Sequence, residues 1–224
     1  MDKSERAKLL EPFLLQPLPP KTLEQTSVYL ELLLKWNARI NLTAIRDEAG
    51  MIARHFGESF FAAQHLFEPG VFEPCASVSS SSFSTIRIID IGSGAGFPAI
   101  PIKLWAGGAK LTMIEANHKK ATFLREAIRT LALVDAEVIS ERAEIVAARK
   151  DLRRADVVTF RAVEHFDEIL KIAVTLLAPG GRVGMLIGSG QRQASSLPYQ
   201  VVWDDPIKVP LAVSRILQIG RKQP

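Results

Sequence analysis

The sequence contains one cysteine, Cys75, among its 224 residues. A single cysteine cannot form a disulfide within the chain, and this is typical of proteins that work in a reducing compartment. Long apolar runs are missing as well, so no membrane-spanning helix is predicted. Residues 1–20 carry acidic side chains and no apolar stretch ahead of a small-residue cleavage site, so no signal peptide is predicted. These absences indicate a cytoplasmic protein without a membrane partner.

A large excess of charge of either sign is also missing. Lysine and arginine together number 28, aspartate and glutamate 24, and the net charge is +4. The chain is 47% hydrophobic and 23% charged, which is an ordinary globular composition. Its length suffices for one well-buried domain. The mild positive balance suits a polyanionic partner such as nucleic acid, although many soluble proteins are equally basic.

The chain divides into three parts by composition. Residues 1–68 show apolar side chains at helical spacing from residue 21 onward and predict an N-terminal helical cap packed on the core. Residues 69–85 hold prolines, a glycine and a run of serines. Such a polar tract buries too little apolar surface to fold, so a flexible loop is predicted there. Residues 86–224 are predicted to form the main domain.

Strand and helix patterns alternate from residue 86 onward. Strands are predicted at 86–91, 110–114, 137–140, 156–160, 182–187, 199–203 and 212–219. This alternation predicts an α/β fold with a doubly wound, mostly parallel, seven-stranded sheet covered by helices on both faces. The last two strands have no helix between them and are expected to form an antiparallel hairpin at the edge.

The clearest motif is a glycine-rich turn between the first predicted strand and a helix. Its glycines are Gly92, Gly94 and Gly96, and Phe97 follows. A dinucleotide site needs its third glycine five positions after the first, so this spacing disfavours an NAD-dependent oxidoreductase. The compact turn resembles the nucleoside-binding turn of class I methyltransferases, which have a Rossmann-like fold and use S-adenosyl-L-methionine. The alternative is a tight turn that binds no ligand.

Two further features support this interpretation. Glu115 ends the second predicted strand, where an acid can accept both ribose hydroxyls of a bound nucleoside. The alternative for Glu115 is a solvated acid at a strand end. The segment Pro179-Gly180-Gly181 stops a predicted helix before the fifth strand, as in class I methyltransferases, and supports the fold only.

Two missing motifs narrow the range of methyl-transfer reactions that the chain could catalyse. Methylation of cytosine C5 needs a cysteine nucleophile, and Cys75 lies in the predicted loop. Methyltransferases of exocyclic amines carry an Asn/Asp-Pro-Pro-aromatic motif after the fourth strand, where this chain reads Thr159-Phe160-Arg161-Ala162. An acceptor that is already nucleophilic, such as a ring nitrogen, remains. It needs positioning and no obligatory general base.

Several segments follow one another in the order of one family. They are Lys35-Trp36-Asn37, Ile40-Asn41-Leu42-Thr43, Arg54-His55, the glycine turn, Lys119-Lys120, Phe123-Leu124 and Thr159-Phe160-Arg161-Ala162. Over residues 22–221 the chain resembles the glucose-inhibited division protein B family, also called RsmG, the bacterial 16S ribosomal RNA guanine-N7 methyltransferases. The resemblance implies methyl transfer to 16S ribosomal RNA, free or in the small ribosomal subunit.

The resemblance also implies site residues. The family's cofactor contacts correspond to Gly92, Phe97, Ala143, Glu144 and Arg161. Glu144 is expected near the adenine amino group, with an exposed acid at a helix start as the alternative. Arg161 is expected to hold the cofactor carboxylate or an RNA phosphate, with a surface salt bridge as the alternative.

Arg142 is assigned a positioning role beside Arg161. RNA contacts are expected from basic residues of one predicted helix: Lys119, Lys120, Arg125 and Arg129. A solvated helix face is the alternative for each of them. Trp36 and His55 either stack on a base or belong to the core of the cap.

The chain departs from the family at Ile187, where a lysine is usual, and at Glu58, where aspartate is more familiar. No metal is expected, and a monomer is expected. Two other functions stay open: a small-molecule methyltransferase, and a non-catalytic nucleotide-binding factor in ribosome assembly. A closed apolar pocket would favour the first, and cofactor binding without turnover would favour the second.

Overall fold

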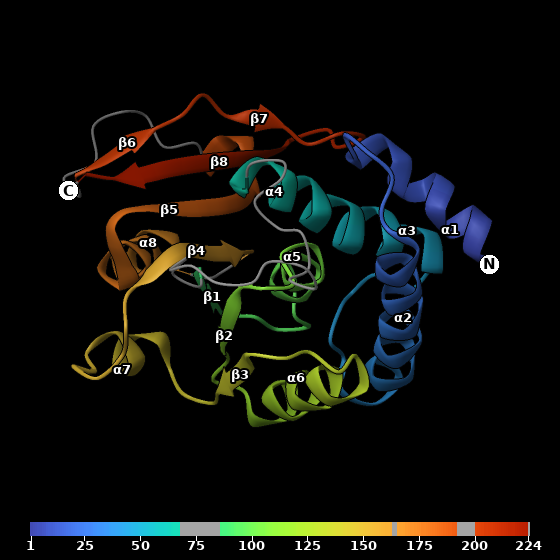
Figure 1. The fold of residues 1–224 in the computed structure, drawn as a ribbon, viewed down its shortest axis with the longest axis horizontal. Coiled ribbons are helices and arrows are strands. Elements are labelled where there is room, and N and C mark those ends of the chain that lie inside the picture. The colour runs from blue at the N-terminus through green and yellow to red at the C-terminus, as the bar shows by residue number, and fades with distance from the viewer. Residues whose placement is uncertain (68–85, 163–164, 192–199, 224) are drawn as a thin grey trace, which may run out of the picture.

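A computed structural model describes residues 1–67, 86–162, 165–191 and 200–223. The predicted serine-rich loop and Cys75 lie outside the described residues. The strands are β1 (Arg87–Ile91), β2 (Lys110–Ile114), β3 (Ala136–Ile139), β4 (Ala155–Arg161), β5 (Leu177–Gly188), β6 (Val201–Trp203), β7 (Ile207–Lys208) and β8 (Arg215–Lys222). They form one sheet in the order β3-β2-β1-β4-β5-β8-β6, with β7 paired to β8 (Figure 1).

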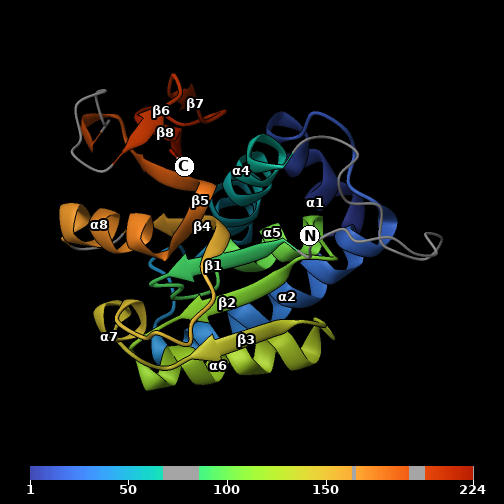
Figure 2. The ribbon, with the colours of Figure 1, turned by 60° about the vertical axis from the view of Figure 1, so that its left-hand side comes forward.

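Helices cover both faces of this sheet. On one face lie α5 (Ala99–Trp105) and α6 (His118–Thr130), and on the other α7 (Ala143–Ala147) and α8 (Phe166–Leu176) (Figure 2). Successive strand residues point to opposite faces. Ile88 therefore packs in the core beneath α5 and α6, and Ile89 in the core beneath α7 and α8. The predicted doubly wound α/β fold is confirmed.

The carboxy-terminal part of the sheet is antiparallel. β8 pairs antiparallel with both β5 and β6, which confirms the predicted antiparallel pairing of the last strands. The two-residue β7 makes an eighth strand that was not predicted, because two residues are too short to show alternation. β5 begins earlier than predicted. The register shifts between β4 and β5, so residues 178–181 form an irregular bulge, in which Gly180 has a φ of +75°.

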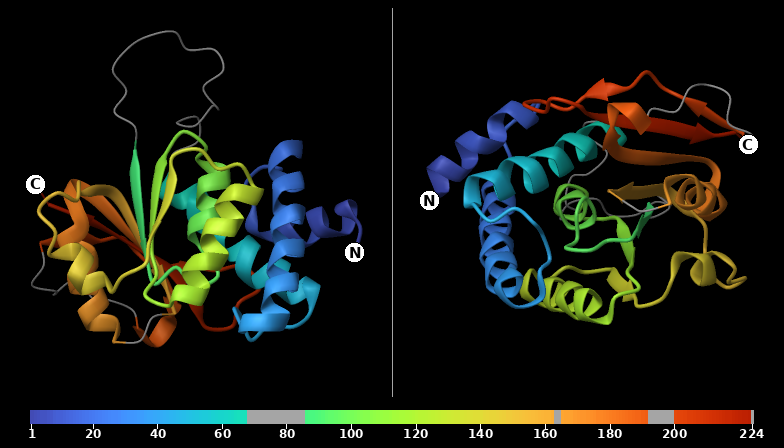
Figure 3. Two further views of the ribbon diagram at one scale, coloured as in Figure 1. Left: turned by 90° about the horizontal axis from the view of Figure 1, so that it is seen from below. Right: turned by 180° about the vertical axis from the view of Figure 1, so that it is seen from behind.

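The cap consists of α1 (Lys3–Leu10), the 3-10 helix η1 (Glu11–Phe13), α2 (Pro20–Ile40), α3 (Glu48–Met51), the π-helix η2 (Ile52–Gly57) and α4 (Glu58–Leu66). Its apolar side chains share one continuous core with β1, α5 and α6. α2 lies beside α6, and α4 lies beside α5 (Figure 3). Within the described part of the chain, no helix is long and apolar enough to cross a membrane.

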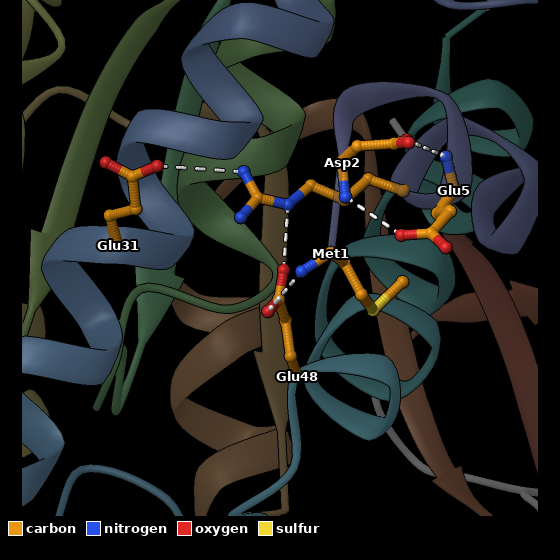
Figure 4. A network of polar contacts seen from close by, with 6 residues as sticks. Met1, Asp2, Glu5, Glu31 and Glu48 are labelled. Carbon is orange, nitrogen blue, oxygen red and sulfur yellow. Dashed lines mark hydrogen bonds and ion pairs between the residues drawn. The ribbon is translucent and has the colours of Figure 1, made fainter.

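Polar contacts fasten α1 to the rest of the cap. Arg6 Nε donates to Glu48 Oε1 at 2.8 Å, and the terminal ammonium of Met1 lies 3.4 Å from Glu48 Oε2 (Figure 4). Further along, Gln64 Nε2 donates to the carbonyl of Phe13 at 2.9 Å. The amino-terminal segment therefore packs against η2 and α4, the elements that face the carboxyl end of β4.

Candidate cofactor and substrate site

The glycine turn leaves the carboxyl end of β1 in a conformation that favours glycine. Gly92, Gly94 and Gly96 have φ values of +66°, +56° and +80°. A Cβ on Gly94 would meet only the carbonyl of Gly92, at 3.8 Å, whereas a Cβ on Gly96 would collide with Tyr29 Oη and the side chain of Ile100. Gly94 therefore leaves room for a ligand, and Gly96 allows the cap to pack.

Glu115 links the end of β2 to this turn. Its Oε2 accepts from the amide of Gly94 and its Oε1 from the amide of Asn117, both at 2.8 Å. The residue is only 7% exposed. Each carboxylate oxygen has a second lone pair. The carboxylate is therefore fixed in place and keeps acceptor capacity for hydroxyl groups.

A pocket of about 450 Å³ opens beside this turn. Five of the predicted residues line it: Gly92, Glu115, Arg142, Ala143 and Glu144. The volume lies within the range of small-ligand sites. A larger cavity of about 620 Å³ lies at the amino ends of β1 to β3, and none of the predicted site residues lines it.

The rim of the 450 Å³ pocket is charged. Arg142 Nε lies 3.5 Å from Glu144 Oε2, and these side chains are 75% and 49% exposed. An ion pair this exposed contributes little to stability. Both side chains are therefore free to meet a ligand at little energetic cost.

Asp90 was missed by the sequence analysis. It is fully buried at the end of β1, and its Oδ1 accepts from Thr159 Oγ1 at 2.6 Å. Its Oδ2 is buried and has no hydrogen-bond partner among the described residues. Burial raises the pKa of Asp90 from 3.8 to about 7. A buried carboxyl oxygen without a partner fits a ligand that supplies a donor, preferably a cationic one. The only signal in the sequence is an acid that ends an apolar strand.

Phe97 faces the cap. Its ring stacks on His55 at 4.8 Å and on Tyr29 at 5.4 Å between ring centroids, and meets Phe56 edge-on at 5.0 Å. Tyr29 Oη also donates to the carbonyl of Ala95 in the turn. Phe97 does not line the 450 Å³ pocket, so its predicted contact with the cofactor stays a prediction.

Arg161 lies at the carboxyl end of β4, and its guanidinium contacts the cap. Nη1 donates to the carbonyl of Arg54 at 2.8 Å, and Nη2 donates to His55 Nδ1 at 3.1 Å. Nη1 also lies 3.7 Å from Glu58 Oε2. Arg161 therefore joins the core to the cap. The guanidinium N–H groups of Arg161 were expected to face the cofactor. In the structure these contacts direct them toward the cap instead.

His55 is neutral in this arrangement. Burial, and then Arg161, lowers the pKa of His55 to about 3. Because a guanidinium only donates, Nδ1 is the acceptor, and Nε2–H donates to Thr43 Oγ1 at 2.7 Å. The Asn41-Leu42-Thr43 segment thus orients His55, and Asn41 ends α2 in the left-handed conformation.

The predicted RNA-binding residues are spread along α6. Lys119 and Lys120 lie in its first turn, which follows the carboxyl end of β2. Arg129 lies in the last turn, about 15 Å away along the helix axis, and pairs with Glu126 at 2.6 Å. Arg125 Nη2 lies 3.4 Å from the carbonyl of Val138. Only the two lysines are therefore near the glycine turn.

Trp36 meets Phe123 of α6 edge-on at 5.7 Å and packs against the core. It therefore contributes to the packing between the cap and α6. Among the described residues, no group of three or more histidine, cysteine, aspartate or glutamate side chains is placed to hold a metal ion.

The strand order, the two helical layers and the glycine turn after β1 define a Rossmann-like methyltransferase fold. A solved structure, a putative methyltransferase yhhF from Escherichia coli, is similar with a TM-score of 0.50 and 16% identity, over 62% of this chain and 77% of that chain. This likeness concerns the fold.

Sequence comparisons give the family. The family model described as rRNA small subunit methyltransferase G matches residues 22–200. A ribosomal RNA small subunit methyltransferase G from Chloroflexus aggregans is 35% identical over 215 residues, covering 92% of this chain and 84% of that protein. One from Roseiflexus sp. is 38% identical over 214 residues, covering 92% and 85%. The chain belongs to the rRNA small subunit methyltransferase G family, which confirms the resemblance found in the sequence.

Proposed function

We propose that this methyltransferase uses S-adenosyl-L-methionine to methylate N7 of a guanine in 16S ribosomal RNA, and that it acts in the cytoplasm. The observation that carries the proposal is the unpartnered, buried Oδ2 of Asp90 beside the open Gly94 turn and the 450 Å³ pocket. A nucleoside with a cationic amino-acid chain supplies the groups that these residues lack.

The residues present fit that cofactor. Glu115 would accept the ribose hydroxyls, and Gly94 would leave room for the methionine chain. Asp90 Oδ2 would accept from the ammonium group. Ala143 and Glu144, at the start of α7, would hold the adenine. S-adenosyl-L-methionine supplies an electrophilic methyl group on a sulfonium sulfur.

The residues around Arg161 fit a ring-nitrogen acceptor. The bound cofactor would supply the methyl group, the N7 lone pair of guanine would accept it, and the positive charge of the sulfonium would end on the guanine ring. No proton is released, so no general base is needed. His55 is neutral and has both ring nitrogens in hydrogen bonds, which agrees with a role in orientation. The protein's part is to hold the two substrates in line.

Basic groups lie at the pocket and near it. Arg142 stands on its rim, and Lys119 and Lys120 lie in the first turn of α6, which follows the carboxyl end of β2. Such side chains neutralise phosphates and position an RNA without reading its sequence. The expected partner is 16S ribosomal RNA, free or in the small ribosomal subunit.

The test uses purified protein with methyl-labelled S-adenosyl-L-methionine and either small subunits or free 16S ribosomal RNA. The expected result is one labelled guanine whose N7-methyl group makes the strand cleavable by reduction and aniline. Label in a small molecule alone would favour the small-molecule methyltransferase. Tight binding of S-adenosylhomocysteine without any transfer would favour the assembly factor.

A further inference from the structure

We propose that Glu58 is a positioning residue for methyl transfer, which holds Arg161 and Arg215 in the orientation that the RNA acceptor requires. This proposal rests on the function proposed above. Glu58 lies too deep to touch the cofactor or RNA, because it is 1% exposed. It acts through the two arginines, which come from different strands of the sheet.

The contacts of Glu58 give it this role. Its Oε1 accepts from Arg215 Nε at 2.7 Å and lies 2.5 Å from Arg215 Nη2. Its Oε2 lies 3.7 Å from Arg161 Nη1, is buried, and has no hydrogen-bond partner among the described residues. One carboxylate from the cap therefore contacts both β4 and β8, and sets how the cap sits over this edge of the sheet.

The charge balance argues against a purely structural role. Arg161 is flanked by two further arginines, Arg54 and Arg215, and by two acids, Glu58 and Asp90, while His55 is neutral. Burying an ion pair is rarely the most stabilising choice, because desolvation offsets the attraction. The cluster keeps a positive charge, and an RNA phosphate is its natural counter-ion. Arg215 directs Nε and Nη2 at Glu58 and its side chain is 27% exposed, so part of the guanidinium is accessible to such a contact.

The local backbone supports the same conclusion. Glu58 directly follows the π-helix η2, and its amide donates to the carbonyl of Ala53, five residues earlier. The extra residue of a π-turn changes which side chains share a face, and such turns are frequent at functional sites. Here His55 and Glu58 both face Arg161.

The experiment compares Glu58→Gln with Glu58→Asp and Ser59→Ala. Ser59 is a matched control, because it is fully buried next to Glu58 and its Oγ donates only within the cap, to the carbonyl of His55. We measure kcat and KM with 16S ribosomal RNA, the Kd of S-adenosylhomocysteine by calorimetry, and the melting temperature.

We expect Glu58→Gln to lower kcat by about ten- to hundredfold, the effect of one charge-assisted contact that acts in the transition state. The Kd of S-adenosylhomocysteine is expected to stay unchanged. Glu58→Asp keeps the charge and restores most of the rate, and Ser59→Ala keeps the wild-type rate. A folded glutamine variant with the wild-type rate overturns the proposal. So does a Kd that weakens in step with the rate, because the effect would then come from the cofactor pocket.

Two further comparisons cover the remaining outcomes. If Glu58→Gln does not fold, Arg215→Gln is compared with the double variant Arg215→Gln/Glu58→Gln, which has one buried charge fewer. A slower double variant supports the proposal, and equal rates overturn it.

If the wild type transfers no methyl group to RNA, the proposed function fails. The contact between Glu58 and Arg215 is then tested by NMR of the Arg215 Nε–H. Slow exchange of this proton with water is expected, and fast exchange overturns the proposed contact.

Discussion

The cofactor pocket and the junction between cap and core lie on the same edge of the sheet, and they are built in different ways. The pocket is lined by residues 91–92, 114–116 and 141–144 and by Ile169, and the amide of Gly94 holds its Glu115 carboxylate. The junction takes Thr43, His55 and Glu58 from the cap, Arg161 from β4 and Arg215 from β8. The pocket is assembled by local chain geometry and the junction by tertiary packing.

Sequence patterns are therefore more informative for the pocket than for the junction. A positive φ restricts the residue type, so the glycine turn has a recognisable spacing. An arginine in an ion pair can come from any element that ends nearby, so the junction has no spacing of its own. If the pocket and the junction are also separate in function, substitutions in the pocket should change cofactor binding, and substitutions in the junction should change the rate of methyl transfer.

Gly94→Val is expected to abolish binding of S-adenosylhomocysteine in calorimetry, because the side chain fills the space beside Gly92 and Glu115. The control is Gly180→Val. Gly180 also has a positive φ, and a Cβ added to it would meet nothing within 4 Å. It lies near the start of β5, away from the carboxyl ends of the parallel strands where the pocket opens. It carries the same backbone strain without touching the pocket, so it should lose stability and keep its affinity. Loss of binding in both variants would point to strain as the cause.

Arg161→Ala is expected to slow methyl transfer by about ten- to hundredfold while S-adenosylhomocysteine still binds. Arg161→Lys restores little, because an ammonium cannot reproduce the two directed contacts to Arg54 and His55. Urea unfolding should show a loss of about 1–3 kcal/mol. The control is Arg182→Ala. Arg182 also donates to a cap carbonyl, that of Leu66, but at the amino end of the strands. A full rate in Arg161→Ala would remove the junction from catalysis.

Asp90→Asn is expected to remove the pH dependence of S-adenosylhomocysteine binding. The ammonium of the ligand favours ionised Asp90, whose pKa is about 7 without it, so wild-type affinity for S-adenosylhomocysteine should rise from pH 6 to pH 8. The asparagine variant should bind about tenfold more weakly at pH 8, with no such rise. Calorimetry in buffers of different ionisation enthalpy checks proton release. Equal pH dependence in both proteins would exclude Asp90 from the pocket.

The same carboxyl affects stability without ligand. A pKa raised from 3.8 to about 7 means that the folded state holds the proton more tightly than the unfolded state. The favourable contribution is therefore complete below about pH 4 and is lost as the pH rises through 7, on the order of 4 kcal/mol in all. Asp90→Asn should gain stability over the wild type across this range in urea unfolding.

Replacing Lys119 and Lys120 together with alanine is expected to weaken RNA binding several-fold and to reduce its salt dependence by roughly one to two phosphate contacts. The control is Arg129→Ala on the same helix. Arg129 is paired with Glu126 in the last turn, away from the glycine turn, and should bind RNA as the wild type does. Equal losses would mean that RNA lies along the whole of α6.

The sequence predicted the alternating strands and helices because their apolar periodicity is local, and this fold is confirmed. The glycine turn and Glu115 were found for the same reason, and their roles stay predictions. Asp90 was missed although it precedes the turn, because its burial and the bond that Oδ1 accepts from Thr159 depend on a neighbouring strand that lies far away in the sequence. Tyr29 and Arg215 were missed because their contacts to the turn and to Glu58 span 66 and 157 residues of chain.

The position of β8 has a consequence for synthesis. β8 lies between β5 and β6, and it follows all the other described strands along the chain. Translation therefore releases β6 and β7 from the ribosome before the strand that pairs with them. A nascent chain that ends before Arg215 already contains the whole cofactor pocket, while Glu58 faces an incomplete set of arginines. The junction between cap and core is therefore completed only when β8 has been synthesised and has paired with β5 and β6.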